Sequence, residues 1–224
     1  MNLFDLSLAG IITRAIVFLV AMDVHEFAHA YVAHLNGDDT AKMMGRMTLN
    51  PAANINWIGY LMGVIIGFGF LGSAPVVASR MRNPRWGMFQ AVLAGPVSNL
   101  LLAAVFAAPL RLGLIPESLL TPTVGSLPSL GDLLGAMIFF NVLLFVFNLI
   151  PLFPLDGWTV VLAALPAGPA VWWQRNQQIS MYLFYALIAL SFLGGYLGPL
   201  AQYNPLDWLV ALPTTQIFHA LLGF

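Results

Sequence analysis

The chain has 224 residues, of which 60% are apolar and 8% are charged, against roughly 25% charged residues in a typical soluble domain. This composition indicates an integral membrane protein, and at about 20 residues per span the length allows five or six membrane segments without a separate soluble domain. A net charge of −1 gives no reason to expect a nucleic-acid partner, and the absence of cysteine excludes disulfides and thiolate metal ligands.

The first predicted helix, Leu8–Leu35, contains the motif His25-Glu26-Phe27-Ala28-His29. Two histidines four residues apart lie on one face of a helix, where both imidazoles can bind the same Zn²⁺ and the glutamate between them can act as a general base. With four His and two Glu in the chain, composition alone predicts about 0.0006 chance occurrences of this motif. A structural pair of buried histidines is the alternative, but burying these side chains in hydrocarbon is costly unless a metal gathers them.

This helix is expected to end at residues 36–39 (NGDD), which are typical helix-stop residues. His29 lies six residues before the end of the helix, hence about 9 Å below that end at 1.5 Å per residue. A metal at His25 and His29 would therefore lie within the membrane and be reachable from the C-terminal side of the helix. Asp23 is also expected inside the membrane, either behind the metal ligands or paired with Arg14.

The segment after the first helix is polar, and residues 45–51 (GRMTLNP) are predicted to form a short strand and turn. The apolar stretch 57–72 that follows has only 16 residues and contains five glycines. It can be a close-packing helix or a re-entrant segment. Basic residues on both of its flanks favour re-entry, with both flanks in the cytoplasm. These basic residues are Lys42, Arg46, Arg80, Arg82 and Arg85.

Asn83 and Pro84 form a helix start, with asparagine as the N-cap and proline at the first helical position. The helix is predicted to cover residues 85–110 and to pack closely through a face of small side chains. Asn99 would lie mid-membrane, where it either forms an interhelical hydrogen bond or acts directly in catalysis. Residues 112–130 carry no basic residue, which is typical of a loop on the outside of the membrane.

The next predicted span covers residues 131–150, and two prolines break it ahead of the sequence Leu155-Asp156-Gly157. A second apolar segment, 158–165, leaves this break, and residues 179–200 form a final span. The core helices are therefore expected at about 8–35, 85–110 and 131–165.

A catalytic zinc site needs a third protein ligand besides two histidines. Soluble relatives of the motif place it six residues after the second histidine or at a glutamate about twenty residues further on. Here position 35 is leucine, and no glutamate lies between Glu26 and Glu117. His34 points about 140° away around the helix, whereas Asp156 is embedded in irregular apolar backbone at membrane depth, so we choose Asp156. The other candidates are Asp38, Asp39, Glu117, Asp132, Asp207 and His219.

Three stretches of the chain form a recognisable combination: HEFAHAYVAHLNGD in the first helix, AGPVSN in the second and FNLIPLFPLDG at the proline break. Together they resemble the site-2 protease family, whose members are intramembrane zinc metalloproteases that cleave transmembrane substrates. The segments GRMTLNP and RNPRWG also match, so the resemblance covers roughly residues 8–164. It is to the compact members of the family, which lack a PDZ or CBS domain.

The resemblance implies roles for five residues. His25, His29 and Asp156 would be the ligands of one Zn²⁺ per chain. Glu26 would be the catalytic base, and Asn148 would stabilise the oxyanion.

Two stretches depart from the family pattern. Residues 54–56 (NIN) stand where a His-Ile-Asp type triplet is usual, and residues 73–76 (SAPV) replace a Lys-Pro-Val-Pro type segment. Both stretches lie around the predicted re-entrant region, which is expected to guide the substrate. These departures therefore bear on how the protein handles its substrate.

We therefore predict an all-α, polytopic membrane protein with five to six membrane segments and a short β or re-entrant element after the first helix. Residues 1–224 are expected to form a single protease domain. Its expected function is zinc-dependent cleavage, within or near a transmembrane helix, of a membrane protein or peptide in the lipid bilayer. The expected location is a prokaryotic cell membrane, with the active site open toward the cytoplasm. A catalytically silent member that binds membrane helices and a metal transporter are the alternatives, and the oligomeric state stays open.

Overall fold

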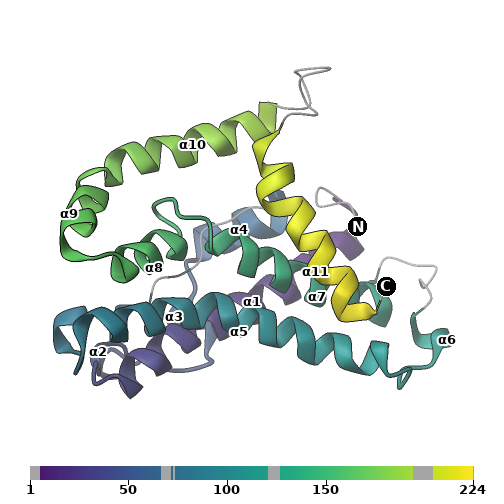
Figure 1. Cartoon of the computed structure of the whole chain (residues 1–224). Helices are drawn as coiled ribbons and strands as arrows, with labels where there is room; N and C mark the ends of the chain where they lie inside the picture. Colours follow the sequence, from purple (N-terminus) through teal and green to yellow (C-terminus); the bar gives the residue numbers. More distant parts are fainter. Residues whose placement is uncertain (1–5, 67–71, 73, 121–126, 194–203, 224) are drawn as a thin grey trace.

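Three long helices form the centre of the fold. The computed structural model describes residues 6–66, 72, 74–120, 127–193 and 204–223. Within these residues, the helices long and apolar enough to cross a membrane are α1 (Leu8–Leu35), α5 (Pro84–Arg111) and α7 (Leu130–Asn148). Helix α5 packs against both α1 and α7, as the ribbon in Figure 1 shows. The chain is therefore a membrane protein built around a three-helix core.

Shorter helices surround this core. Helix α8 packs on α5, and α11 packs on both α5 and α7. In Figure 1, α9 and α10 extend from α8 as an arm beside the central helices, and α11 runs back over α7. The bounds of these elements are α2 Thr40–Met43, α3 Pro51–Asn54, α4 Trp57–Ile66, η1 Ala78–Arg80, α6 Glu117–Leu120, α8 Asp156–Ala164, α9 Ala167–Arg175, α10 Gln177–Leu193, η4 Asp207–Ala211 and α11 Leu212–Leu222.

Side-chain caps fix the beginnings of the three long helices. Ser7 Oγ accepts a hydrogen bond from the Gly10 N–H at 3.0 Å at the start of α1. Asn83 Oδ1 accepts from the Trp86 N–H at 3.2 Å, and Pro84 occupies the first turn of α5, which confirms the predicted helix start. At α7, Ser129 and Asp132 form a reciprocal capping box. These bonds satisfy N–H groups that a helix leaves unpaired at its first turn.

The face of small residues predicted on α5, at Ala91, Ala94, Gly95 and Ser98, is confirmed in part. Ala91 and Gly95 are buried, whereas Ala94 and Ser98 are half-buried. Buried Ala103 and Ala107 extend the row along the helix, where small side chains let neighbouring helices approach closely. Large side chains fill the space between α1 and α7, with the rings of Phe18 and Phe140 at a centroid distance of 4.8 Å. Close packing of α5 is what brings its backbone near the histidine motif of α1.

The predicted strand over residues 45–51 is wrong. These residues form a turn and bends that lead into α3, and the described part of the chain contains no strand. Side chains satisfy the backbone locally here: Thr48 Oγ1 accepts from the Asn50 N–H at 3.2 Å, and Asn50 Oδ1 accepts from the Ala52 N–H at 3.1 Å. Because these bonds are made within the segment, it does not need the pairing partner that a strand requires.

The predicted number of five to six membrane segments is not shown by the structure. Three helices meet the length and hydropathy of a span among the described residues. The predicted final span corresponds to α10, which has 17 residues from Gln177 to Leu193, and residues 194–200 lie outside the described part.

Helix α4, as far as the structure describes it, is shorter than a membrane span. Its ten residues correspond to about 15 Å, half of a hydrocarbon core of about 30 Å. The buried guanidinium of Arg14 donates from Nε to the Val64 carbonyl at 2.6 Å, which satisfies a carbonyl near the end of α4. Gly72 lies so close to Asn54 that an added Cβ would overlap the Asn54 backbone oxygen. Gly72 thus lies beside the segment that leads into α4, and the prediction of re-entry over 57–72 falls in part on residues 67–71, which lie outside the described part of the chain.

Asp38 joins the end of α1 to the segment that leads into α5. Its buried carboxylate accepts hydrogen bonds from the Val77 N–H at 2.6 Å and from both the N–H and the hydroxyl of Thr40. Burial by itself would raise the pKa of Asp38, but these hydrogen bonds, together with the charge of Arg80, hold that pKa below its ordinary value. Asp38 is therefore a structural carboxylate in the loop after α1.

Single cysteines at Thr40 and Ser79 should be labelled from the same side of the membrane. Arg80 Nη1 donates to Thr40 Oγ1 at 2.9 Å, and the Arg82 N–H donates to the Asn36 carbonyl at 2.9 Å, so the two segments lie side by side. The measurement is labelling with a membrane-impermeant maleimide in oriented vesicles. Labelling from opposite faces would contradict this arrangement and would require residues 57–72 to cross the bilayer.

Candidate metal centre

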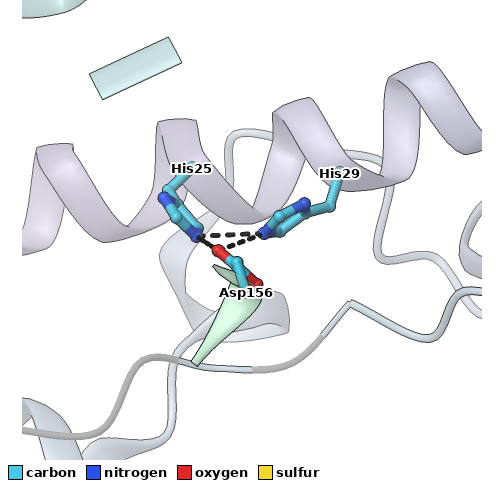
Figure 2. Close-up of side chains that lie close together, drawn as sticks. All are labelled: His25, His29 and Asp156. Atoms are coloured by element: carbon cyan, nitrogen blue, oxygen red, sulfur yellow. Dashed lines mark hydrogen bonds and ion pairs between the residues drawn. The ribbon is translucent and has the colours of Figure 1, made fainter. Parts of the chain in front are cut away.

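Three side chains from α1 and α8 converge on one point (Figure 2). His25 Nε2 lies 3.0 Å from His29 Nε2 and 3.1 Å from Asp156 Oδ2, and His29 Nε2 lies 3.4 Å from the same oxygen. Both histidines are buried, with exposed fractions of 1% and 7%, and Asp156 retains 22% exposure of its side chain. Among the described residues, these three form the cluster of potential ligands that could hold a metal ion.

The break between α7 and α8 positions Asp156. Helix α7 ends at Asn148, and α8 begins at Asp156, so the carboxylate lies at a helix N-terminus, where negative charge is favoured. Gly157 packs against the end of α7 so closely that an added Cβ would lie 2.6 Å from the Leu149 carbonyl carbon. A glycine is therefore required beside Asp156 for α8 to start where it does.

Arg85 holds the other end of α8 against α5. Its Nε donates to the Ala163 carbonyl at 2.8 Å, and its Nη2 donates to the Ala164 carbonyl at 2.5 Å. Carbonyls of the last turn of a helix have no partner within the helix, and a cation there also complements the helix dipole. This contact links the position of α8, and thus of Asp156, to the first turn of α5.

The imidazoles are oriented by hydrogen bonds that they donate to acceptors on α5. His25 Nδ1 lies 2.6 Å from Asn99 Oδ1, and His29 Nδ1 lies 2.8 Å from the Ala91 carbonyl. Both partners are acceptors, so each Nδ1 carries the proton and each Nε2 presents a lone pair. Metal-binding histidines commonly use this arrangement, in which the outer nitrogen donates to a protein oxygen.

The donor set fits a zinc ion. Two Nε2 lone pairs and a carboxylate oxygen face one another, and Asp156 Oδ2 is buried without a hydrogen-bond partner in the described part of the chain. Three converging acceptors repel unless a cation lies between them. Tetrahedral coordination with bonds of about 2.0–2.1 Å places ligand atoms about 3.3–3.4 Å apart, close to the distances of 3.0–3.4 Å found here.

Glu26 and Asn148 border the same cavity as the three clustered side chains. The cavity has a volume of about 600 Å³. Glu26 is buried, and its Oε2 accepts a hydrogen bond from the Ala74 N–H at 2.6 Å. Asn148 is also buried, and its Nδ2 donates to the Leu144 carbonyl at 3.0 Å, which uses one of its two amide hydrogens. All five residues chosen from the sequence therefore lie around one cavity.

The other candidate ligands lie elsewhere. His34 pairs with Asp39 at 2.5 Å, Asp38 binds the backbone of the following loop, and Asp132 caps α7. Asp207 is 3.4 Å from Asn204 Nδ2, and His219 lies in α11. The side chain of Glu117 lies outside the described part of the structure. Each described alternative is thus separate from the cluster.

Two polar residues of the membrane region have partners that the sequence did not reveal. Asp23 Oδ1 accepts a hydrogen bond from Asn54 Nδ2 at 3.0 Å, which joins α1 to α3. Asn99, for which an interhelical bond and a catalytic role were both open, contacts His25 directly. The pairing of Asn99 with His25 depends on the packing of two helices whose residues are 74 positions apart, so no local pattern could have predicted it.

Comparison with known proteins agrees with this site. Over 190 residues, the chain is 35% identical to a Bacillus subtilis (strain 168) protein named "Putative zinc metalloprotease YwhC", a match that covers 84% of this chain and 81% of the relative. The chain belongs to the site-2 protease family. Membership of a family of zinc metalloproteases implies Zn²⁺ as the metal, and the group of His25, His29 and Asp156 could bind a metal ion.

Two further relatives carry the same kind of name. "Putative zinc metalloprotease Rip2" of Mycolicibacterium smegmatis is 31% identical over 159 residues, which are 68% of this chain and 58% of that protein. Rip2 of Mycobacterium tuberculosis is 29% identical over 163 residues, which are 70% of this chain and 59% of that protein. No family model matches the chain, and no solved structure matches it.

Proposed function

We propose that this site-2 protease family member is an intramembrane zinc endopeptidase. It hydrolyses a peptide bond within or near a transmembrane helix of a membrane-protein substrate, and residues 1–224 act as one protease domain. The observation that carries the proposal is the cluster of His25, His29 and Asp156 beside Glu26. The two histidines and Glu26 lie on α1, a helix long enough to span a membrane, and Asp156 reaches them from α8.

Each side chain of the site has a distinct task. His25, His29 and Asp156 hold the zinc ion. The bound ion supplies Lewis-acid polarisation of the scissile carbonyl and lowers the pKa of water toward about 7. Glu26 accepts the proton of the attacking water and passes it to the leaving amine. Asn148 donates an amide hydrogen to the carbonyl oxygen as it becomes negative.

The bilayer imposes a further requirement on the substrate. A peptide bond inside a helix has its carbonyl hydrogen-bonded and its backbone shielded by side chains, so the substrate has to unwind locally before attack. Water reaches the buried Glu26 through the cavity of about 600 Å³. A substrate helix with glycine or proline near the scissile bond should therefore be cleaved faster than a regular helix.

We assign the open side of the site to the cytoplasm of a prokaryotic cell, in a multi-pass protein. Five of the eight basic residues lie near the C-terminal end of α1 and the start of α5, at the membrane side closest to His29. Cytoplasmic segments carry an excess of lysine and arginine, which supports this orientation. The five residues are Lys42, Arg46, Arg80, Arg82 and Arg85.

Two other functions are less well supported. A catalytically silent member that only binds membrane helices would not need Glu26, which is intact and borders the cavity. A metal transporter needs ionisable ligands repeated along a path across the bilayer, whereas His25, His29 and Asp156 gather at one depth.

Quantitative proteomics of membrane-protein fragments tests the proposal. Cells that produce the wild-type protein should release fragments cut within membrane segments, and cells with equal amounts of Glu26→Gln should not. The same fragments from both cultures would contradict the proposal.

Asn148→Ala should retain zinc but cleave a helical membrane substrate about 10²–10³ times more slowly, the usual loss for one oxyanion donor. The measurements are zinc content and single-turnover cleavage in detergent. The matched control is Asn176→Ala, which removes a half-buried asparagine whose Nδ2 donates to the Trp172 carbonyl outside the cavity. An Asn148→Ala rate equal to that of the control would exclude this role.

A further inference from the structure

Helix α5 forms one wall of the metal centre through three positions that are one turn apart. The Ala91 carbonyl lies 2.8 Å from His29 Nδ1, and Asn99 Oδ1 lies 2.6 Å from His25 Nδ1. Gly95 lies between them, and an added Cβ there would be 2.7 Å from His25 Nε2 and closer still to His29 Nε2. Residues spaced by four share one face of a helix, so a single face of α5 meets both imidazoles.

The surroundings of Asn99 leave its amide group one orientation. Its side chain is fully buried, and Nδ2 lies 3.1 Å from the Ala21 carbonyl and 2.8 Å from Asn141 Oδ1. A carbonyl oxygen only accepts, so the NH₂ group has to face Ala21, and the Asn99 oxygen then faces His25. The reversed amide would place two oxygens against each other in a site without solvent, which is costly.

Asn141 on α7 is itself oriented by a backbone carbonyl. Its Nδ2 donates to the Met137 carbonyl at 2.8 Å, which turns its Oδ1 toward Asn99. Asn141 is fully buried as well. The two asparagines, called here the Asn pair, thus connect α7 to a metal ligand on α1 by hydrogen bonds of defined direction.

We propose that Asn99 is a positioning residue of the zinc centre and that Asn141 orients it. The Asn pair keeps the proton of His25 on Nδ1 and aims the Nε2 lone pair at the metal. The inference rests on the proposed role of His25 as a zinc ligand, and it does not depend on protease activity. Asn148 lies seven residues after Asn141 on α7, so this helix supports the metal centre with one asparagine and borders the cavity with another.

Asn99→Leu is the decisive variant, because leucine has a similar size but cannot accept the hydrogen bond from His25. Loss of such a partner typically lowers metal affinity by about 10–100-fold. Zinc affinity of the full chain in nanodiscs is measured by competition with a chelator. The absorption spectrum of the Co²⁺-loaded protein provides a second readout, and its d–d bands should shift because the His25 ring is no longer held.

Two further variants separate positioning from stability. In Asn141→Leu, the NH₂ group of Asn99 still has the Ala21 carbonyl as an acceptor. The zinc affinity of this variant should therefore fall by less than the zinc affinity of Asn99→Leu. Ile138→Ala removes a buried side chain from the same helix α7 without touching the Asn pair, and it should retain wild-type zinc affinity and Co²⁺ bands. The unfolding temperatures of the metal-free proteins are measured as well, so that zinc affinities are compared between variants of similar stability.

Wild-type affinity and wild-type Co²⁺ bands in folded Asn99→Leu would overturn the proposal. So would an Ile138→Ala variant that loses as much affinity as Asn99→Leu, because general loosening of the bundle would then explain the effect. Should Asn99→Leu fail to fold, Asn141→Leu decides the question by the same two readouts. If affinity falls as expected while Glu26→Gln cleaves like the wild type, the protease function fails and the role of the Asn pair stands.

Discussion

Glu26→Gln should retain one zinc ion per chain yet cleave a helical membrane substrate about 10²–10⁴ times more slowly, or not measurably. Glu26 is not one of the three residues whose ligand atoms converge on the metal position, so zinc retention should not depend on the charge of Glu26. An amide cannot accept the proton of the attacking water, and loss of a positioned general base costs rates of this size.

Glutamine also preserves the local structure around position 26. Glu26 Oε2 accepts a hydrogen bond from the Ala74 N–H, and the glutamine oxygen can accept the same bond. The matched control is Asp132→Asn, which makes the same change from carboxylate to amide at the capping box of α7, away from the cavity. Zinc content and cleavage in detergent are measured for both. Wild-type cleavage by Glu26→Gln would remove the base from the mechanism and the metalloprotease assignment with it.

The parts of the fold that depend on local chemistry were predictable from the sequence. The bounds of α1 follow from a long apolar run that ends at residues 36–39 (NGDD), and the start of α5 follows from Asn83 and Pro84. The rejection of His34 as a ligand also holds, because its position around the helix directs it to Asp39. In each case the deciding interaction lies within a few residues along the chain.

The choice of Asp156 required a different kind of argument. The carboxylate lies 127 residues after His29, so no spacing rule connects them, but an ionisable group in a proline break at membrane depth has few other reasons to be there. The structure brings the two within 3.4 Å of each other. Asp156 was therefore identified from the cost of burying a charge in hydrocarbon and not from a sequence motif.

Contacts that depend on helix packing could not be predicted. The bond between Asn99 and His25 exists because small residues on α5 let it approach α1 at one particular register. The contact of the Ala74 N–H with Glu26 depends on the path of a segment whose sequence departs from the family pattern. The strand prediction for residues 45–51 was wrong because of local contacts. Side-chain hydrogen bonds within the segment satisfy its backbone, so it needs no partner strand.

Asp156→Ala should lower zinc retained on purification from one per chain to a small fraction of that value. Two imidazoles alone leave zinc short of the three protein ligands that catalytic sites use, and the Oδ2 atom that this variant removes lies 3.1 Å from His25 Nε2. Zinc is measured by mass spectrometry after size-exclusion chromatography, with far-UV circular dichroism to show that the helices persist.

The effect should be specific to the ligand rather than to lost negative charge. Asp39→Ala removes an exposed carboxylate in the loop after α1, where Asp39 pairs with His34 of that helix. This variant should retain full zinc content. Asp156→Asn keeps one oxygen in place but loses the charge that balances the metal, so its zinc content should lie between those of the wild type and Asp156→Ala. Full zinc content in Asp156→Ala would exclude this carboxylate as a ligand, and the third ligand would then have to come from residues outside the His25, His29 and Asp156 cluster.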